Sequence, residues 1–388
     1  MDILPAPYHR EPELNALRDS VRRFVERELI PLEAELKHHP RLDKVQKAAV
    51  RERARKAGLW MLDIPESLGG QGLSLEAMSV FWEEVARAAV LTARDLDVFG
   101  PVAGPILCNL QGELRQRYLD PVLAGEKQAC FAQTEPDAGS DPASMRTRAR
   151  KEGDVYILSG TKRFISHADH ADFAQVFAVT DPEKRARGGI SCFLVDLDSP
   201  GITRSTDHMI MGDALGEIHF DDVRVPARNL VGAEGEGFAF AQHAINHGRI
   251  RHAAQACGAM ERCLELTMEY VRQRRTFGAP IGERQGVQWM LADGYQNLHA
   301  ARLLTMDAAA KADAGLPVQY ETLMAKLFAV EHAFKVVDDC LQLHGATGLS
   351  IESPIHRFWL EMRSFRITEG ATEVLKTTLA RRIQASLP

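Results

Sequence analysis

The period of the hydrophobic pattern changes twice along the chain, and this order restricts the folds that it can adopt. Between residues 11 and 128 apolar residues such as Leu17, Val21 and Phe24 recur at helical spacing. From about residue 129 to 240 short apolar runs are bounded by Gly, Asp and Pro, which is typical of strands. The helical period then returns. A doubly wound nucleotide-binding fold alternates strand and helix, so this order argues against it.

The middle segment contains several short strand candidates. Apolar runs lie at 155–158, 175–179 and 192–195. Residues 218–221 alternate between apolar and polar, as in a half-buried strand, and 223–225 alternate in a shifted frame that Pro226 stops. These patterns predict a small β domain.

The C-terminal segment predicts long helices. One apolar face runs from Ile250 to Val271, and further helices are expected at 285–313, 318–343 and 369–385. We therefore expect an α+β, mainly α fold of three domains within the 388 residues. These are an N-terminal helical domain at 1–128, a middle small β domain at 129–240 and a C-terminal helical bundle of four helices at 241–388.

Composition excludes several functions. The net charge of −6 is spread along the chain, so no basic face is expected for nucleic acid or an anionic membrane. The six cysteines form no C-x-x-C pair and are expected to be reduced, mostly buried thiols. We find no secretory signal and no run of 18 apolar residues, so we expect no membrane span and a cytoplasmic location.

Two weaker patterns could suggest ligand sites. The Gly-rich run at 232–237 resembles a phosphate loop, but no strand within a βαβ unit precedes it, so a turn into the third domain is preferred. His243 and His247 have a spacing that can bind metal, yet no carboxylate or cysteine accompanies them. We predict no metal.

Two runs carry the chemistry. The first, at 131–141, reads Phe-Ala-Gln-Thr-Glu-Pro-Asp-Ala-Gly-Ser-Asp. Its small residues allow a flat ligand to approach the backbone, and its N–H groups with the Thr134 and Ser140 hydroxyls can bond polar ring edges. The second, Arg-Ile-Thr-Glu-Gly-Ala-Thr-Glu at 366–373, contains the carboxylate of Glu369. Either run alone fits a surface loop.

Together these runs resemble the acyl-CoA dehydrogenase family, and the similarity extends over nearly the whole chain. The further matching segments are Phe-Ile-Ser at 164–166, Phe-Asp-Asp-Val-Arg-Val-Pro at 220–226, Arg-Arg-Thr-Phe-Gly at 274–278 with Gln285, and Gln-Leu-His-Gly-Ala-Thr-Gly at 342–348. The resemblance implies an FAD-dependent oxidoreductase of acyl-CoA or fatty acid catabolism. It also implies a homo-oligomer, commonly a homotetramer, with an electron-transfer flavoprotein as acceptor.

The resemblance also assigns residue roles. Thr134 should contact the flavin pyrimidine side, Ser166 should lie at N5, Phe164 should pack on the ring, and Arg274 should pair with the diphosphate of a neighbouring subunit's FAD. The implied cofactor-binding residues are Phe131, Gln133, Thr134, Ser140, Phe164, Ile165, Ser166, Arg274, Thr276, Phe277, Gln285, Gln342, Leu343, Gly345, Ala346, Ala371, Thr372 and Glu373. The implied substrate-binding residues are Ser140, Asn246, Arg249 and Gly370.

The implied reaction is α,β-desaturation of an acyl-CoA thioester. Glu369 is the expected base for the α-proton, while the β-carbon transfers a hydride to flavin N5. Burial beside an apolar substrate should raise the pKa of Glu369. The base's own N–H is expected to donate a hydrogen bond to the thioester oxygen. The alternative for Glu369 is an exposed carboxylate at a helix N-terminus.

The chain also departs from the family pattern. Thr368 replaces an aromatic residue before the base, and Phe164 replaces a tryptophan. The remaining departures are Glu-Gly-Ala at 369–371, Gly-Ala at 345–346 and Leu-Glu-Met-Arg at 360–363.

The alternatives are a flavin oxidase or monooxygenase of the same fold, and a non-catalytic acyl-CoA-binding relative.

The acyl pocket is poorly specified. The charged segment 94–99 could close a pocket for a short or polar acyl group, or form solvated or interface salt bridges, which are preferred.

Overall fold

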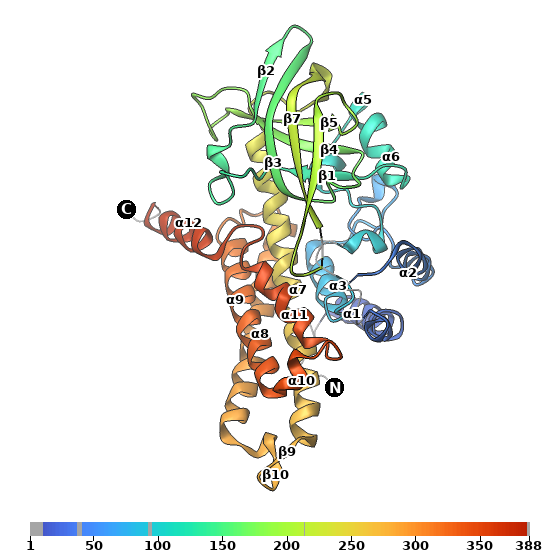
Figure 1. The fold of residues 1–388 in the computed structure, drawn as a ribbon, viewed down its shortest axis with the longest axis vertical. Helices are drawn as coiled ribbons and strands as arrows, with labels where there is room; N and C mark the ends of the chain where they lie inside the picture. Colours follow the sequence, from blue (N-terminus) through green and yellow to red (C-terminus); the bar gives the residue numbers. More distant parts are fainter. Residues whose placement is uncertain (1–10, 37–40, 92–94, 213, 386–388) are drawn as a thin grey trace. The chain divides into compact units, whose positions relative to one another are not determined.

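The computed structural model describes residues 11–36, 41–91, 95–212 and 214–385 (Figure 1). The chain divides into two compact units. Unit 1 comprises Met1–Asp63, Gln71–Phe99 and Asn246–Pro388, and unit 2 comprises Ile64–Gly70 and Gly100–Ile245. The N-terminal helices thus share a core with the C-terminal helices, whereas residues 100–128 belong with the sheet. The predicted three-domain boundaries stay a prediction.

The N-terminal part of unit 1 is helical, as its apolar spacing predicts. Side-chain caps fix two helix starts: Asp43 forms a capping box with Gln46, and Ser74 accepts from the N–H of Ala77. The elements are α1 (Pro12–Phe24) with a π-helical turn (Val25–Leu29) and a 3₁₀ turn (Ile30–Ala34), α2 (Lys44–Lys56), α3 (Leu75–Val85) and a 3₁₀ turn (Asp95–Phe99).

The C-terminal helices complete unit 1. They are α7 (Gly237–Gln273), α8 (Gln285–Asp313), α9 (Glu321–His344), α10 (Ala346–Leu349), α11 (Ile355–Phe365) and α12 (Thr372–Ala385), with a hairpin of β9 (Arg275–Thr276) and β10 (Ala279–Pro280) and a 3₁₀ turn (Ile281–Glu283) between α7 and α8.

The helices differ from the prediction in two places. The sequence did not predict α11. The helix expected from residue 369 begins only at Thr372, because Glu369 and Gly370 have positive φ angles of 53° and 101°.

Unit 2 contains the predicted β domain, preceded by short helices. Its helical elements are a 3₁₀ turn (Glu66–Leu68), α4 (Pro105–Cys108), α5 (Gly112–Leu114), a π-helical turn (Arg115–Leu119) and α6 (Asp120–Leu123). Its strands are β1 (Ala129–Ala132), β2 (Arg148–Glu152), β3 (Val155–Ser166), β4 (Phe173–Val179), β5 (Ile190–Asp196), β6 (Ile202–His208), β7 (Ala214–Pro226) and β8 (Leu230–Val231), with 3₁₀ turns at Pro142–Ser144 and Ala227–Asn229.

These strands form one eight-stranded sheet of order β6-β7-β3-β2-β4-β5-β8, with β1 parallel to β4. The frame shift seen in the sequence of β7 is a bulge. Leu158 on β3 pairs with Val223 and Gly160 pairs with Phe220, so β7 carries an extra residue there, and Asp222 has a φ of 48°. The predicted α+β, mainly α fold is confirmed.

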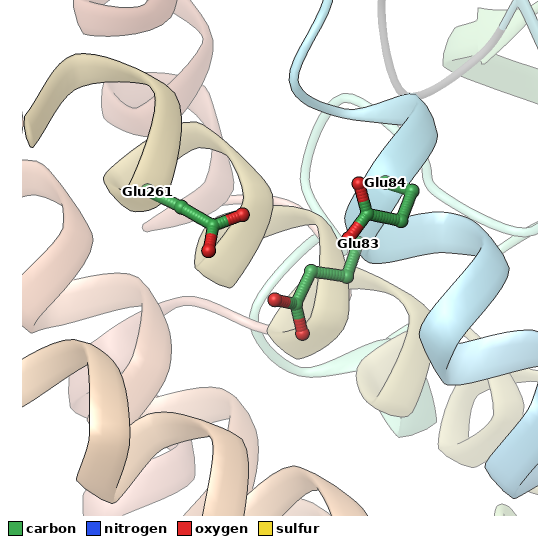
Figure 2. A group of neighbouring side chains, drawn as sticks. All are labelled: Glu83, Glu84 and Glu261. Atoms are coloured by element: carbon green, nitrogen blue, oxygen red, sulfur yellow. The ribbon is translucent and has the colours of Figure 1, made fainter. Parts of the chain in front are cut away.

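Three carboxylates approach one another inside unit 1. Glu83 and Glu84 lie on α3 and Glu261 on α7, and all three side chains are buried (Figure 2). One oxygen from each lies within 4.8 Å of the others. Such a group requires neutralisation, because buried charges without partners are costly.

Arginines provide that neutralisation. Arg22 on α1 contacts Glu84 and Glu261 at 2.7 and 2.8 Å, and Arg302 on α8 contacts Glu261 at 2.7 Å and also pairs with Glu83. Burial alone would raise the pKa of Glu261, but Arg302, Arg87 and Arg22 lower it to about 2. The cluster is therefore an ion-pair network that joins α1, α3, α7 and α8.

The six cysteines all lie in the described part of the chain and are thiols outside any disulfide, and five of them are buried, as predicted. Burial raises the pKa of Cys130 and Cys340 to about 12, so these thiols are protonated at neutral pH. Among the described helices, none combines the length and apolar character needed to cross a bilayer.

Candidate active site

Glu369 lies in the turn between α11 and α12 in a left-handed conformation. Its φ of 53° is uncommon for a residue with a side chain, and such strain persists only where surrounding contacts hold it. The carboxylate is about one quarter exposed, at 24%. It is neither buried in the core nor part of a helix.

The carboxylate lies against the helix α7. Gly248 provides the space for it, because a Cβ at this position would lie 2.7 Å from Glu369 Oε1. Arg251, also on α7, places Nη2 3.8 Å from the same oxygen. Arg251 therefore lies at ion-pair distance from the carboxylate.

Arg249 links two of the predicted site residues. Its Nε donates to the carbonyl oxygen of Glu369 at 3.2 Å, and its Nη1 donates to Asn246 Oδ1 at 2.9 Å. Burial lowers the pKa of Arg249, while Glu369 opposes that shift. The side chain thus fixes the backbone of Glu369 from the α7 side.

The helix α9 holds the same turn from another side. Lys326 Nζ donates to the carbonyl oxygen of Gly370 at 2.8 Å. Glu331 accepts from Arg366 at 2.7 and 3.0 Å and from the Thr372 hydroxyl at 2.6 Å. The segment 366–372 is therefore bound at its two ends and in its middle.

The residue before Glu369 contacts a histidine. Thr368 Oγ1 lies 3.1 Å from His252 Nε2, and the other ring nitrogen lies 3.0 Å from the Gly248 carbonyl oxygen. The carbonyl accepts only if Nδ1 carries the proton, so a neutral His252 accepts from Thr368 through Nε2. The departure from an aromatic residue at 368 thus provides a hydroxyl to a buried imidazole.

The first run of the sequence, at 131–141, lies in unit 2. Glu135 anchors it: the carboxylate accepts from Lys162 Nζ at 2.8 Å and from the N–H groups of Arg146 and Thr147. Burial lowers the pKa of Lys162 to about 8, and Glu135 opposes this shift. Lys162 also donates to the Gln133 carbonyl, so the run is held by its backbone and by Glu135.

Several predicted flavin-binding residues of unit 2 present unused groups. Gln133 is buried, yet its Nε2 has no hydrogen-bond partner among the described residues. Phe164 is 47% exposed and has a φ of 58°, while Ile165 beside it is buried. Thr134 and Ser166 are partly buried, Phe131 packs on Phe177 at 4.8 Å, and Ser140 is exposed. A polar ring edge and a flat face are the groups that would satisfy this set.

Apart from Ala371, Thr372 and Glu373, the predicted cofactor residues of unit 1 divide into two sets. Arg274, Thr276, Phe277 and Gln285 lie on the β9–β10 hairpin and the start of α8, and Gln342, Leu343, Gly345 and Ala346 lie at the C-terminal end of α9. The two sets are joined where the rings of Tyr270 and His344 stack at 4.3 Å. Phe277 is 99% exposed.

These sets lie far from Glu369. Lys326, which contacts Gly370, is 16 residues before Gln342 on α9. At 1.5 Å per residue this separation is roughly 24 Å. In Figure 1 the hairpin accordingly lies at the end of the bundle opposite to the start of α12. Ala371, Thr372 and Glu373 lie beside Glu369, with Thr372 buried and Glu373 exposed.

The charged segment 94–99 forms salt bridges, although Arg94 lies outside the described residues. Lys47 on α2 contacts Asp95 at 2.8 Å, and Arg51 pairs with Asp97. Asp95 is 2% exposed. The salt bridges of Asp95 and Asp97 are thus made within the chain, with α2, and the preferred interpretation as a solvated loop or interface salt bridges stays a prediction.

Sequence reasoning missed Lys326, Gly248 and Glu331. Lys326 did offer a signal, because it interrupts the apolar run Leu323–Val330 on a predicted helix. Gly248 was a second signal, because it lies inside the helical segment predicted from about residue 241, where glycine is unfavourable.

Family descriptions match three consecutive segments of the chain. "Acyl-CoA dehydrogenase, N-terminal domain" matches residues 11–126, the middle domain matches 130–223, and the C-terminal domain matches 235–384.

Individual relatives match over nearly the full length. The short-chain specific acyl-CoA dehydrogenase of Mus musculus mitochondria is 36% identical over 94% of this chain and 88% of its own length. The butyryl-CoA dehydrogenase structure from Megasphaera elsdenii is 30% identical with a TM-score of 0.84, covering 96% of this chain and 98% of that one. An FAD complex of PigA is 26% identical with a TM-score of 0.87, covering 96% and 98%. The chain therefore belongs to the acyl-CoA dehydrogenase family.

Proposed function

We propose that this chain is an FAD-dependent acyl-CoA dehydrogenase that uses Glu369 as the base for α,β-desaturation. The observation that carries the proposal is the arrangement of Glu369: a carboxylate on a left-handed turn, against Gly248, with its backbone held by Arg249. A base must be fixed within a fraction of an ångström to be effective, and these contacts fix it.

The chain's own groups account for half of the reaction. Glu369 takes the α-proton, and its own N–H donates to the thioester oxygen and stabilises the enolate, as the family resemblance implies. Arg249 holds the Glu369 carbonyl, which keeps that peptide unit oriented. FAD, when bound, supplies N5 as the acceptor of the hydride from the β-carbon.

Two features of unit 2 support an FAD site. The buried Nε2 of Gln133 needs an acceptor, and the exposed ring of Phe164 offers a flat apolar face. The polar edge and the flat rings of a flavin provide both. Thr134, Ile165 and Ser166 would complete this side of the site, and Ala371, Thr372 and Glu373 are the candidates that follow the base.

The separation along α9 supports a site shared between subunits. Gln342 lies roughly 24 Å along α9 from Lys326, which contacts the turn of the base, and Arg274 and Gln285 lie with the hairpin at the same end of the bundle as Gln342. We propose that they bind the adenosine-diphosphate part of FAD in another subunit of a homo-oligomer, as the resemblance implies. The fully exposed Phe277 fits such a contact, since large apolar side chains at interfaces are buried by the partner.

The names of the relatives indicate a substrate class. The mouse relative is specific for short chains and the Megasphaera elsdenii relative acts on butyryl-CoA. We therefore propose a short acyl-CoA as substrate. An electron-transfer flavoprotein is the proposed acceptor, in keeping with the family.

The test is an anaerobic titration of the purified flavoprotein with short, branched, aromatic and long acyl-CoAs. We expect a short acyl-CoA to bleach the visible flavin band, and Glu369→Gln to retain FAD and bind acyl-CoA while losing bleaching by orders of magnitude. Near-wild-type bleaching by Glu369→Gln would exclude Glu369 as the base. A flavin band that no acyl-CoA bleaches would favour an oxidase or monooxygenase, and a colourless protein a non-catalytic relative.

A further inference from the structure

The turn that carries Glu369 is held by α9 at three places. Glu331 binds Arg366 at one end of the segment and Thr372 at the other. Lys326, five residues earlier on the same helix, binds the carbonyl oxygen of Gly370 at 2.8 Å. Because α9 is a regular helix of 24 residues, it provides a rigid frame for these contacts.

Lys326 is unusual among the side chains of this helix. It is 1% exposed and lies between apolar neighbours in the run Leu323–Val330. Burying an ammonium group is expensive, and an apolar residue of similar volume would fill the same space without that cost. A methionine would fill the same space, so what lysine adds at position 326 is the hydrogen bond to the Gly370 carbonyl.

The contact acts on the peptide unit directly after Glu369. Gly370 has a φ of 101° and Glu369 one of 53°, so both residues are in conformations that need external support. Arg249 on α7 donates through Nε to the Glu369 carbonyl oxygen at 3.2 Å, and Lys326 on α9 donates through Nζ to the Gly370 carbonyl oxygen. Two consecutive carbonyl groups are thus fixed by cationic donors, whose hydrogen bonds are stronger than neutral ones.

We propose that Lys326 is a positioning residue that keeps the Glu369–Gly370 turn in its strained conformation and so aims the carboxylate at the substrate. This inference rests on the proposed function of Glu369. It adds a residue that touches no reacting atom but determines where the base lies.

The charge of Lys326 gives the proposal a pH signature. The pKa of Lys326 is lowered to about 8, chiefly by burial and further by the positive charge of Arg249 on α7. The carboxylates of Glu369 in the turn, Glu331 on α9 and Glu373 on α12 oppose this shift. Above about pH 8 the amine is neutral and its hydrogen bond to Gly370 is weaker. Between this pKa and the ordinary value of 10.5 the unfolded chain binds more protons, so the contribution of Lys326 to stability rises with pH. Loss of activity without loss of stability is therefore the mark of a loosened turn.

The variants are Lys326→Met, which keeps the volume and removes the donor, and Lys326→Arg, which keeps a cation. Lys335→Met is the matched control, because Lys335 lies on the same helix but is exposed and pairs with Asp339. Each holoenzyme is measured for FAD content, thermal midpoint, KM, kcat and the rate of anaerobic flavin bleaching across pH 6 to 10. Hydrogen exchange of the backbone amides in 366–372 is followed in parallel by mass spectrometry.

We expect Lys326→Met to lose kcat by about ten- to a hundredfold at pH 7 with KM, FAD content and thermal midpoint retained. We also expect it to lose the alkaline fall of kcat near pH 8 and to exchange the amides of 366–372 faster. Lys326→Arg should recover part of kcat, and Lys335→Met should match the wild type.

Wild-type kcat and exchange in Lys326→Met would overturn the proposal, as would a kcat loss accompanied by equal losses of FAD and thermal stability. If Lys326→Met does not fold, a wild-type kcat that stays level through pH 8 to 9 overturns it. A wild-type protein that no acyl-CoA bleaches contradicts the proposed function instead, and the exchange data then still decide whether Lys326 holds the turn.

Discussion

The carboxylate of Glu369 occupies the space that a side chain on Gly248 would take. A Cβ at Gly248 would lie 2.7 Å from Oε1 and 2.8 Å from Cδ of Glu369. Gly248 lies well inside α7, where glycine is about 1 kcal/mol less favourable than alanine. The helix thus has its unfavourable glycine at the position where the carboxylate of the base needs the space.

Replacing Gly248 by alanine should displace the Glu369 carboxylate. We expect Gly248→Ala to lower kcat by up to about a hundredfold. The free energy of unfolding should be unchanged or higher, because alanine favours the helix. Stopped-flow flavin reduction and urea unfolding measure the two effects. Gly286→Ala on α8, where nothing lies within 4 Å of the added Cβ, is the control. A variant with normal turnover would show that the carboxylate can work from another position.

Glu331 should make the turn sensitive to acid. Burial by itself raises the pKa of Glu331, but the hydrogen bonds and charge of Arg366 and the Thr372 hydroxyl outweigh it and lower the pKa below 4.5. The stabilisation is therefore present above pH 4.5 and is lost as the pH falls through the lowered value.

We expect Glu331→Gln to reduce the free energy of unfolding by about 1 kcal/mol at pH 7. The difference should shrink progressively below pH 4.5, as the wild-type carboxylate takes up a proton. Urea unfolding at pH 7 and at a pH below 4.5 tests this, and Glu126→Gln at an exposed position is the control. A difference that is independent of pH would assign the effect to packing.

The hydrogen bond between Thr368 and His252 predicts a local stability effect. Thr368→Val keeps the shape and removes the hydroxyl that lies 3.1 Å from Nε2 of the buried imidazole. We expect a loss of about 1 kcal/mol in the free energy of unfolding. Thr377→Val is the control, because Thr377 is exposed and its hydroxyl donates to the Glu373 carbonyl within α12. Equal losses in both variants would mean that the contact with His252 contributes nothing.

The pattern of the sequence was sufficient for four of the eight strands of the sheet, β3, β4, β5 and β7, whereas β1, β2, β6 and β8 were missed. Short apolar runs bounded by Gly, Asp and Pro located β4 and β5, period-2 alternation located β7, and the frame shift before Val223 marked a real bulge. The helix α11 was missed although Ile355, Phe358, Met362 and Phe365 follow a helical face. Because this helix is short and is flanked by loops, its periodic sequence signal is weaker than that of the long helices beside it.

The position of Glu369 followed from family resemblance, whereas its conformation could not be read from the sequence. The predicted helix began at 369 because the residues there suit a helix N-terminus. The structure instead holds Glu369 and Gly370 at positive φ through contacts from Arg249 and Lys326, which are 120 and 44 residues away from their partners. Contacts over such separations are a product of tertiary packing and leave no local signal.

The ion-pair network at the centre of unit 1 predicts one large stability effect. Arg302 is 4% exposed and binds Glu83 and Glu261, so removing it leaves two buried carboxylates short of a partner. We expect Arg302→Met to reduce the free energy of unfolding by about 3–5 kcal/mol. The exposed Arg381→Met should change it little. Because Arg302 on α8 and the two carboxylates on α3 and α7 all belong to unit 1, unfolding of that unit should show the loss. Chemical denaturation followed by tryptophan fluorescence measures it, since Trp82 lies buried on α3 beside Glu83. A loss below about 1 kcal/mol would mean that Arg22 and Arg87 neutralise the carboxylates without Arg302.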